Sequence, residues 1–229
     1  MTTIAIHQPN YAPWLGYFHK LARADVFVFL DDVQFSKGSY INRVQIAGED
    51  AARWLTLPVS VSLGTSISDV RIVRDDWKRA HLDTLKGTYS QAAAFKDAWP
   101  DVEEIYESLP GDDLARTNEA LVTALAWKLE IRTKTVRSSQ VDTDGLAGDN
   151  RLIAIVRQLA PGGTYLSGKG GGKYQDADKF ASAGLGLEYT NFEHPVYDQG
   201  GREFAQGLSV LDAIFHLGWA GTARLLAPH

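Results

Sequence analysis

The first 30 residues constrain the fold of this chain more than any other segment. A short apolar run at residues 3–6 is followed by a loop with two prolines, and then by helical spacing of apolar residues over residues 14–24. Residues 26–30 are apolar at every position, which is typical of a strand covered on both faces of a parallel sheet. Strand, loop, helix and strand in this order predict a βαβ unit with a right-handed crossover.

Strands and helices continue to alternate along the rest of the chain. We expect strands at residues 53–61, 68–73, 133–138, 164–166 and 187–192. We expect helices at residues 76–130, capped at Asp75-Asp76 and broken at Pro100 and Pro110, and at residues 150–159, 176–183 and 208–217. Because no repeat or long linker marks a boundary, the sequence predicts a single α/β domain over residues 1–229. Its sheet is expected to be Rossmann-like and mostly parallel, with a helical insertion at about residues 76–130.

Charge and composition exclude several functional classes. The chain has 23 Lys and Arg against 28 Asp and Glu, a net charge of −5 that does not favour a nucleic-acid partner. The N-terminal residues lack the features of a signal peptide, and no apolar run approaches the roughly 18 residues of a membrane span. We therefore expect a cytoplasmic protein without a membrane partner. The absence of cysteine removes thiolate nucleophiles and thiolate metal ligands, so reactive groups must come from other residue types.

Polar residues follow the first two predicted strands. His7 and Gln8 end the first strand, and Asp31 and Asp32 end its neighbour. Ligands of open parallel sheets bind beyond the carboxyl ends of the strands, which predicts that these side chains lie close together. Successive strand residues point to opposite faces, so we expect one Asp to face the site while the other caps or pairs. His7 and one Asp can act as acid–base partners or metal ligands, and a structural histidine is the alternative. The sequence predicts no closed metal site.

The glycine-rich segment at residues 167–174 follows a predicted strand. It departs from the phosphate-binding pattern G-x-x-x-x-G-K-[ST] because a glycine follows Lys169, and the dinucleotide pattern G-x-G-x-x-G also fails. Its backbone N–H groups and lysines still favour an anion site, with a flexible surface turn as the alternative. The candidate phosphate-binding residues are Ser167, Gly168, Lys169, Lys173 and Tyr174.

Two further polar groups are candidates for the site. The first consists of Lys37, Asn42, Arg43, Lys78 and His81. A guanidinium such as that of Arg43 binds phosphate or carboxylate through paired hydrogen bonds, while a solvated charge cluster is the alternative. The second group is the proline-containing loop at residues 194–199, which includes His194 and Tyr197.

These motifs together resemble the WbqC-like protein family. The string HQPNYAPWLGYF at residues 7–18, the run VFVFLDDVQFSK at residues 26–37 and the pair Asn42-Arg43 carry the resemblance. Residues 165–168, Tyr174, residues 194–199 and residues 208–215 are also similar to the family, so the resemblance covers nearly the whole chain. One departure is His216, where the pattern has Asn after Phe, and it leaves the role of this position open.

The resemblance implies a setting in bacterial O-antigen or other surface-polysaccharide biosynthesis. It also implies that one functional surface contains His7, Gln8, Trp14, Gly16, Tyr17, Asp31, Asp32, Lys37, Asn42 and Arg43. From this we predict a transferase that acts on a sugar nucleotide or similar anionic, phosphorylated precursor, with acyl or aminoacyl transfer as the expected reaction. The candidate catalytic residues are His7, oriented by Asp31 or Asp32, together with His81 and His194. The candidate substrate-binding residues are Gln8, Tyr11, Trp14, Tyr17, Lys37, Asn42, Arg43 and Tyr197.

Two other functions stay open at this point. The order of the first elements looks like the H-x-G-H arrangement of nucleotidyltransferase-type folds, with Trp14 and Tyr17 in place of both histidines. That likeness implies ATP as a cofactor for adenylation or ligation, with Lys169 and Lys173 closing over its phosphates. A non-catalytic binding protein is the third hypothesis, because no complete catalytic motif is present. The sequence does not define the oligomeric state.

Overall fold

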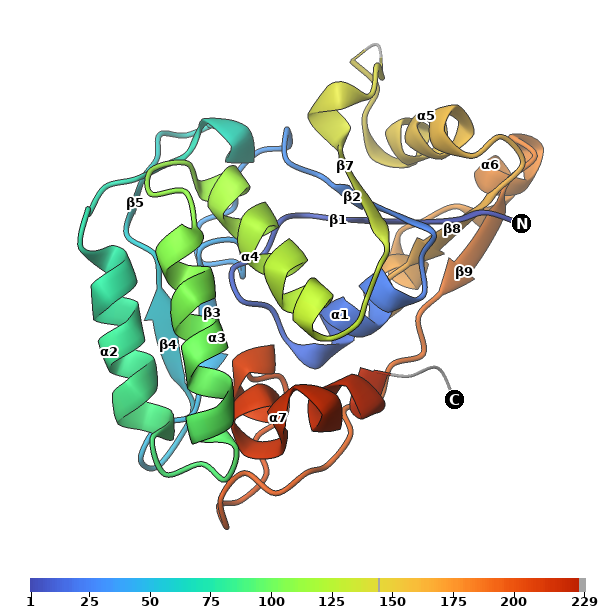
Figure 1. The fold of residues 1–229 in the computed structure, drawn as a ribbon. Coiled ribbons are helices and arrows are strands. Elements are labelled where there is room, and N and C mark those ends of the chain that lie inside the picture. Colours follow the sequence, from blue (N-terminus) through green and yellow to red (C-terminus); the bar gives the residue numbers. More distant parts are fainter. Residues whose placement is uncertain (144, 227–229) are drawn as a thin grey trace.

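The computed structural model describes residues 1–143 and 145–226, which form an α/β structure (Figure 1). Among these residues, five strands form the central sheet in the order β7-β2-β1-β8-β9. The strands are β1 (Thr3–His7), β2 (Val26–Phe29), β7 (Lys134–Arg137), β8 (Thr164–Ser167) and β9 (Gly186–Tyr189). All neighbouring strands are parallel, which confirms the predicted Rossmann-like α/β class.

The strand order reverses next to β1, the middle strand of the sheet. The chain proceeds outward from β1 through β2 to β7 on one side, and from β8 to β9 on the other. His7 at the end of β1 lies beside Phe29 of β2, and Ala5 lies beside Leu166 of β8. The switch point between β1 and β8 is the position where open parallel sheets bind ligands.

Different helices cover the two faces of the sheet, because side chains alternate along β1. Ala5 faces the larger hydrophobic core, to which α1 and α7 contribute. Ile4 and Ile6 face the other core with Ile155 of α5 and Phe180 of α6. Figure 1 shows the two pairs of helices on opposite sides of the sheet. They are α1 (Leu15–Ala22), α5 (Gly148–Leu159), α6 (Ala177–Ser182) and α7 (Val210–Leu226).

The segment predicted to be helical over residues 76–130 contains α2 (Trp77–Tyr89), α3 (Phe95–Ser108) and α4 (Leu114–Lys128). Pro110 separates two of these helices as expected, whereas the predicted break at Pro100 is wrong, because α3 continues through it. Proline removes one backbone hydrogen bond there, and the buried face of α3, including Val102 and Tyr106, holds the helix in place. Asp76 precedes α2 but pairs with Arg74 at 2.6 Å instead of capping the helix.

Several predicted strands are shorter than expected. The segment at residues 53–61 divides at Pro58, which has no N–H for a sheet ladder, and residues 67–69 form a 3-10 turn. The last strand ends at Tyr189 rather than at residue 192, and α7 runs past residue 217 with a kink at Gly218. The remaining elements are β3 (Arg43–Ile46), β4 (Arg53–Thr56), β5 (Val59–Ser60), η1 (Ile67–Asp69), β6 (Arg71–Ile72), η2 (Ser138–Gln140) and η3 (Lys169–Lys173). Among the described helices, none has both the length and the apolar character needed to cross a membrane.

Candidate functional site

Two adjoining cavities lie beyond the carboxyl ends of β1 and β8, at the switch point of the sheet. Their volumes are about 590 and 320 Å³, and both are lined by His7, Lys20, Gly168 and Gly170. We call the combined space the His7 cleft, with a larger and a smaller half. Its position agrees with the expectation that the site lies where β1 ends.

His7 presents an unprotonated ring nitrogen in this cleft. Its Nδ1 lies 3.1 Å from the Gln8 carbonyl oxygen. A carbonyl only accepts, so Nδ1 carries the hydrogen and the lone pair of the neutral ring lies on Nε2. Burial and the neighbouring Lys20 charge lower the pKa of His7 to about 3, although its hydrogen bond to Gln8 opposes the shift. His7 is therefore a neutral imidazole near pH 7.

Lys20 is a site residue that the sequence predictions missed. It lies on α1, and its Nζ donates to the Ile6 carbonyl oxygen at 2.7 Å. Burial lowers the pKa of Lys20 to about 7, so its charge is only partly developed at neutral pH. An anion in the cleft would stabilise the ammonium form. The sequence did contain a sign of this role: Lys20 follows Tyr17 by three residues, so both lie on the same, buried face of the predicted helix.

The larger half of the cleft combines apolar walls with polar atoms that have no partner. Leu30, Val33 and Leu152 contribute apolar surface. The Nε of Arg151 and the Oε1 of Gln175 are buried and have no hydrogen-bond partner among the described residues. A ligand with both a donor and an acceptor would satisfy them. Neither residue was a candidate in the sequence, although Arg151 lies in the predicted helix at residues 150–159.

The smaller half brings together residues from both ends of the chain. Trp14, Tyr17 and His194, three of the predicted site residues, line it together with Phe192. The ring of His194 lies edge-on at 5.1 Å from that of Phe192, and burial lowers the pKa of His194. A Cβ atom at Gly16 would lie 2.8 Å from the Phe192 ring and 2.9 Å from the Trp14 indole nitrogen. Glycine at position 16 therefore allows this wall to pack closely.

The glycine-rich segment forms one wall of the cleft as a short 3-10 helix. Gly168 lines both halves, and Lys169 lines the smaller one. The Gly171 N–H donates to the Gly168 carbonyl at 2.8 Å, so this amide is used within the segment. Ser167 and Tyr174 line the larger half, whereas Lys173 is exposed and lines neither. Phosphate binding by this segment stays a prediction.

Asp31 and Asp32 bind the segment after β7. Asp31 accepts from the Ser139 N–H at 3.0 Å and from the Ser139 hydroxyl at 2.7 Å. Asp32 accepts from the Ser138 hydroxyl at 2.5 Å and pairs with Arg151 at 2.5 Å. Although partial burial opposes the shift, these two contacts lower the pKa of Asp32. Asp32 thus holds Arg151 at the wall of the cleft.

The prediction that Asp31 or Asp32 orients His7 is wrong, because both carboxylates bind other residues. The Gln8 carbonyl orients His7 instead. The strand alternation expected for Asp31 and Asp32 does not apply, because β2 already ends at Phe29. The two carboxylates therefore share Ser138, at 3.1 and 2.5 Å, instead of pointing to opposite faces.

The other candidate residues lie outside the His7 cleft. Tyr11 is fully buried and lies within hydrogen-bond distance of His81 and Tyr106, at 2.6 and 2.9 Å. Burial lowers the pKa of His81 to about 4; the Thr56 carbonyl opposes this shift and the Arg74 charge adds to it. This network belongs to the core of the helical part, so the candidates Tyr11 and His81 do not face the His7 cleft.

Residues from β3 and from the segment before it are likewise separate from the His7 cleft. Asn42 donates to the Leu57 carbonyl at 3.0 Å, and the guanidinium of Arg43 lies 4.0 Å above the Trp54 ring. Lys37 is exposed and lines neither half of the cleft.

The C-terminal candidates also have partners outside the cleft. Tyr197 donates to Asp212 at 2.7 Å. His216 lies on α7, edge-on to Tyr89 of α2, with ring centroids 6.2 Å apart. Among the described residues, no three His, Asp or Glu side chains gather as metal ligands would.

Comparison with known proteins defines the family of this chain. It is 30% identical over 221 residues to the uncharacterized protein Rv1507c of Mycobacterium tuberculosis, and the aligned region covers 95% of each protein. No solved structure matches the chain significantly. The model of the WbqC-like protein family matches residues 8–224. The matched region begins at Gln8, next to His7, and includes Lys20 and the whole glycine-rich segment. The chain therefore belongs to the WbqC-like protein family.

Proposed function

We propose that the His7 cleft transfers an acyl or aminoacyl group in reactions of a sugar nucleotide or a similar phosphorylated precursor. One observation carries the proposal: the unprotonated Nε2 of His7 and the amine of Lys20 belong to residues that line the same cavity. A base and a cationic anchor are the two groups that such a transfer needs. Membership of the WbqC-like family supports a place in surface-polysaccharide or related biosynthesis.

Binding of the anionic precursor is assigned to Lys20 and Arg151. Both cations line the larger half of the cleft, and Gly168 and Gly170 allow a phosphate to approach the backbone closely. The negative charge raises the pKa of Lys20 and offsets the field that lowers the pKa of His7. Substrate binding therefore strengthens His7 as a base.

His7 then moves the proton of the transfer step. The acceptor hydroxyl or amino group attacks the acyl carbon of the donor, and its proton passes to His7 Nε2. When the bond to the leaving group breaks, the same proton passes from Nε2 to that group, so His7 returns to its starting state. The Gln8 carbonyl stabilises the transient imidazolium through the Nδ1 hydrogen.

The proposal is tested by measuring binding and transfer separately. Calorimetry and thermal unfolding with UDP- and dTDP-sugars should detect binding, since a ligand at 100 times its Kd adds about 2.7 kcal/mol of stability. Lys20→Met should abolish this binding, whereas His7→Gln should keep it and lose transfer, followed by mass spectrometry of the sugar nucleotide with acyl and aminoacyl donors. Lys37→Gln, outside the cleft, is the matched control.

The same panel separates the alternative functions. If ATP alone stabilises the protein and Lys169→Ala removes the effect, an adenylating or ligating enzyme replaces the proposed transferase. If sugar nucleotides bind but His7→Gln has full transfer activity, the catalytic role of His7 is wrong. If no phosphorylated compound binds, the proposed function is overturned.

A further inference from the structure

A second cleft lies between helices α3 and α4 and the edge strand β7. Its volume is about 1130 Å³, and none of its lining residues lines the His7 cleft. Its charged lining residues are Glu104, Arg116, Glu119, Lys128 and Arg137. We call it the Glu119 cleft, and neither the sequence nor the family assigns it a role.

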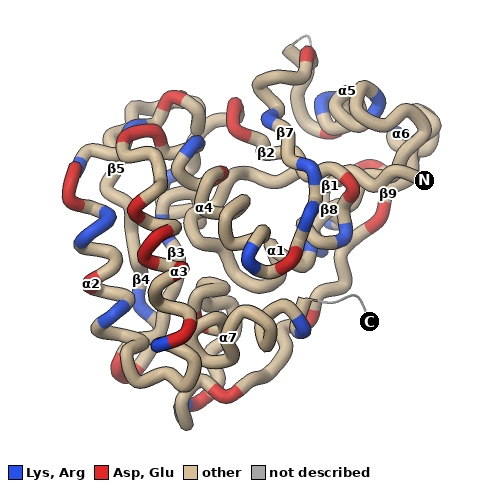
Figure 2. The backbone as a smooth tube through the Cα atoms, viewed as in Figure 1, with Lys and Arg blue, Asp and Glu red and all other residues tan. Residues whose placement is uncertain are grey.

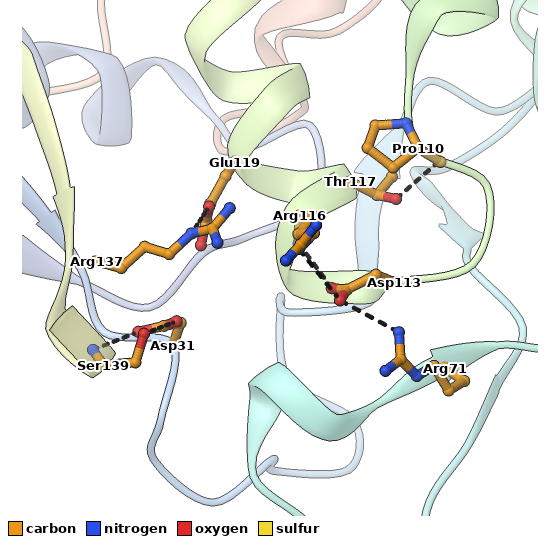
Figure 3. A network of polar contacts seen from close by, with 9 residues as sticks. All are labelled: Asp31, Arg71, Pro110, Asp113, Arg116, Thr117, Glu119, Arg137 and Ser139. Atoms are coloured by element: carbon orange, nitrogen blue, oxygen red, sulfur yellow. Dashed lines mark hydrogen bonds and ion pairs between the residues drawn. The ribbon is translucent and has the colours of Figure 1, made fainter.

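Glu119 reaches from α4 toward the end of β7 (Figure 3). Its Oε2 accepts from the Arg137 Nε at 2.5 Å, and only 9% of its side chain is exposed. The other carboxylate oxygen, Oε1, is buried and has no hydrogen-bond partner among the described residues. A buried carboxylate oxygen without a donor is costly, so a ligand that donates a hydrogen bond would be stabilised there.

Arg137 offers the complementary group. It is the last residue of β7, and 32% of its side chain is exposed. Its Nε is used by Glu119, while its two terminal nitrogens have no hydrogen bond to the residues that the structure describes. Paired N–H groups of a guanidinium match the two oxygens of a carboxylate.

The other cations of the cleft already have partners. Lys128 pairs with Asp101 at 2.6 Å, and Arg116 with Asp113 at 3.7 Å. Figure 2 shows acidic residues along α3 and basic residues along β7. Glu104 of α3 and Arg137 of β7 both line the cleft, so its lining carries charges of both signs. Glu119 and Arg137 are two charged lining residues in direct contact with each other, and each keeps atoms that can bind a ligand.

We propose that the Glu119 cleft binds a free α-amino acid with a large apolar side chain, with its ammonium group on Glu119 and its carboxylate on Arg137. Adjacent positive and negative groups of one small molecule fit the adjacent groups of the ion pair. Apolar surface for the side chain comes from Phe29, Ile105, Ala120, Ala124, Trp127 and Val136. The proposal is independent of the function assigned to the His7 cleft.

The protonation of Glu119 supports this choice of ligand. Burial raises the pKa of Glu119 to about 6, although Arg137 opposes the shift, and the charges of Asp31 and Asp113 add to it. Tyr17 from α1 also interacts electrostatically with Glu119. An ammonium group beside the carboxylate favours its charged form, so binding should weaken as the pH falls below about 6.

Isothermal titration of the full chain with three probes tests the proposal without any variant. L-phenylalanine should bind, whereas L-phenylalaninamide lacks the carboxylate and N-acetyl-L-phenylalanine lacks the ammonium group. Each analogue should bind at least about tenfold more weakly, as expected for the loss of one charge-assisted hydrogen bond. Equal affinity for either analogue, or no binding of L-phenylalanine, overturns the proposal.

Two variants then locate the site. Glu119→Gln and Arg137→Gln should each weaken L-phenylalanine binding by about tenfold or more. The exposed pair Arg79 and Asp83 gives matched controls, because Arg79→Gln and Asp83→Asn remove similar charges elsewhere. Folding is checked by circular dichroism. Unchanged affinity in a folded Glu119→Gln variant would place the ligand in another part of the protein.

Discussion

His7 and Tyr17 donate to the same oxygen, the backbone carbonyl of Gln8. The distances are 3.1 Å from His7 Nδ1 and 3.0 Å from the Tyr17 hydroxyl, and the two rings lie edge to face at 4.7 Å. One carbonyl thereby sets the tautomer of the imidazole and fixes α1 against the end of β1. The lone pair at His7 Nε2 depends on this shared acceptor.

Removal of the Tyr17 hydroxyl should cost stability without changing the His7 tautomer. In Tyr17→Phe the ring packing remains and one buried hydrogen bond is lost, which lowers the free energy of unfolding by about 1 kcal/mol. Urea denaturation measures this change, and nitrogen-15 chemical shifts of His7 report the tautomer. A shift of the hydrogen to Nε2 would show that Gln8 alone does not hold the ring.

Replacement of Lys20 should make the protein more stable and less able to bind anions. Lys20→Met keeps the length of the side chain and removes a buried amine whose pKa has fallen to about 7. Removal of a buried charge in favour of an apolar group stabilises a protein by roughly 1–3 kcal/mol. Chemical denaturation at pH 6 measures the gain, and a destabilised, folded variant would contradict it.

Acid should destabilise the protein through its buried histidines. The pKa values of His7 and His81 fall to about 3 and about 4 in the folded state, so below pH 6.5 the unfolded chain binds more protons. Stability is therefore present above pH 6.5 and is lost as the pH falls toward these values. Each histidine contributes roughly 1.4 kcal/mol per pH unit in this window.

A comparison of His81→Gln with the wild type separates the effect of His81 on stability from the titration of other groups. Glu119 has the opposite effect on the free energy of unfolding between pH 6 and 4.5. Because its pKa is raised in the folded state, the folded protein binds its proton more tightly there and gains stability as the pH falls. The unfolding free energy of His81→Gln should depend less steeply on pH than that of the wild type. The reason is that the variant takes up about one proton fewer on unfolding. Parallel curves for the two proteins would show that His81 is not buried in its neutral form.

Tyr11 should matter for stability and not for chemistry at the His7 cleft. Tyr11→Phe removes contacts at 2.6 and 2.9 Å, with His81 and Tyr106, and leaves buried polar groups unsatisfied. The expected loss is about 2 kcal/mol in the free energy of unfolding. Ligand affinity at the His7 cleft, measured by calorimetry, should stay the same. A large loss of affinity would return Tyr11 to the binding residues.

A methyl group at Gly16 should close the smaller half of the cleft. The added Cβ would lie 2.8 Å from the Phe192 ring, so the wall must shift or Trp14 must move into the cavity. Gly16→Ala is expected to weaken ligand binding more than it weakens the fold. Gly87→Ala is the control, since open space surrounds Gly87 in α2 and alanine there should stabilise the helix by about 0.5–1 kcal/mol.

The sequence predicted the sheet well because its strands carry strong local signals. Residues 26–30 are apolar at every position, and such a run rich in β-branched and aromatic residues is typical of a strand buried on both faces. The small strands were harder to predict. Pro58 divides one expected strand, and the pairing of β3 with β4 depends on contacts that no local pattern records.

The candidate site was predicted in part, because sequence order shows strand ends but not the directions of side chains. His7, Trp14, Tyr17 and His194 do line one cavity. Tyr11 lies within the same motif, yet its ring turns into the core toward His81. Lys20 was missed because a lysine in a helix is usually solvent-exposed, and its burial depends on the sheet beneath α1.

The place of β1 in the sheet has a consequence for folding during synthesis. β1 leaves the ribosome before one of its two neighbours, β8, which begins only at Thr164. Until then one edge of β1 has no partner, and such edges promote association with other chains. The His7 cleft, which needs both strands, can form only after β8 has been made, which favours slow folding dominated by distant contacts.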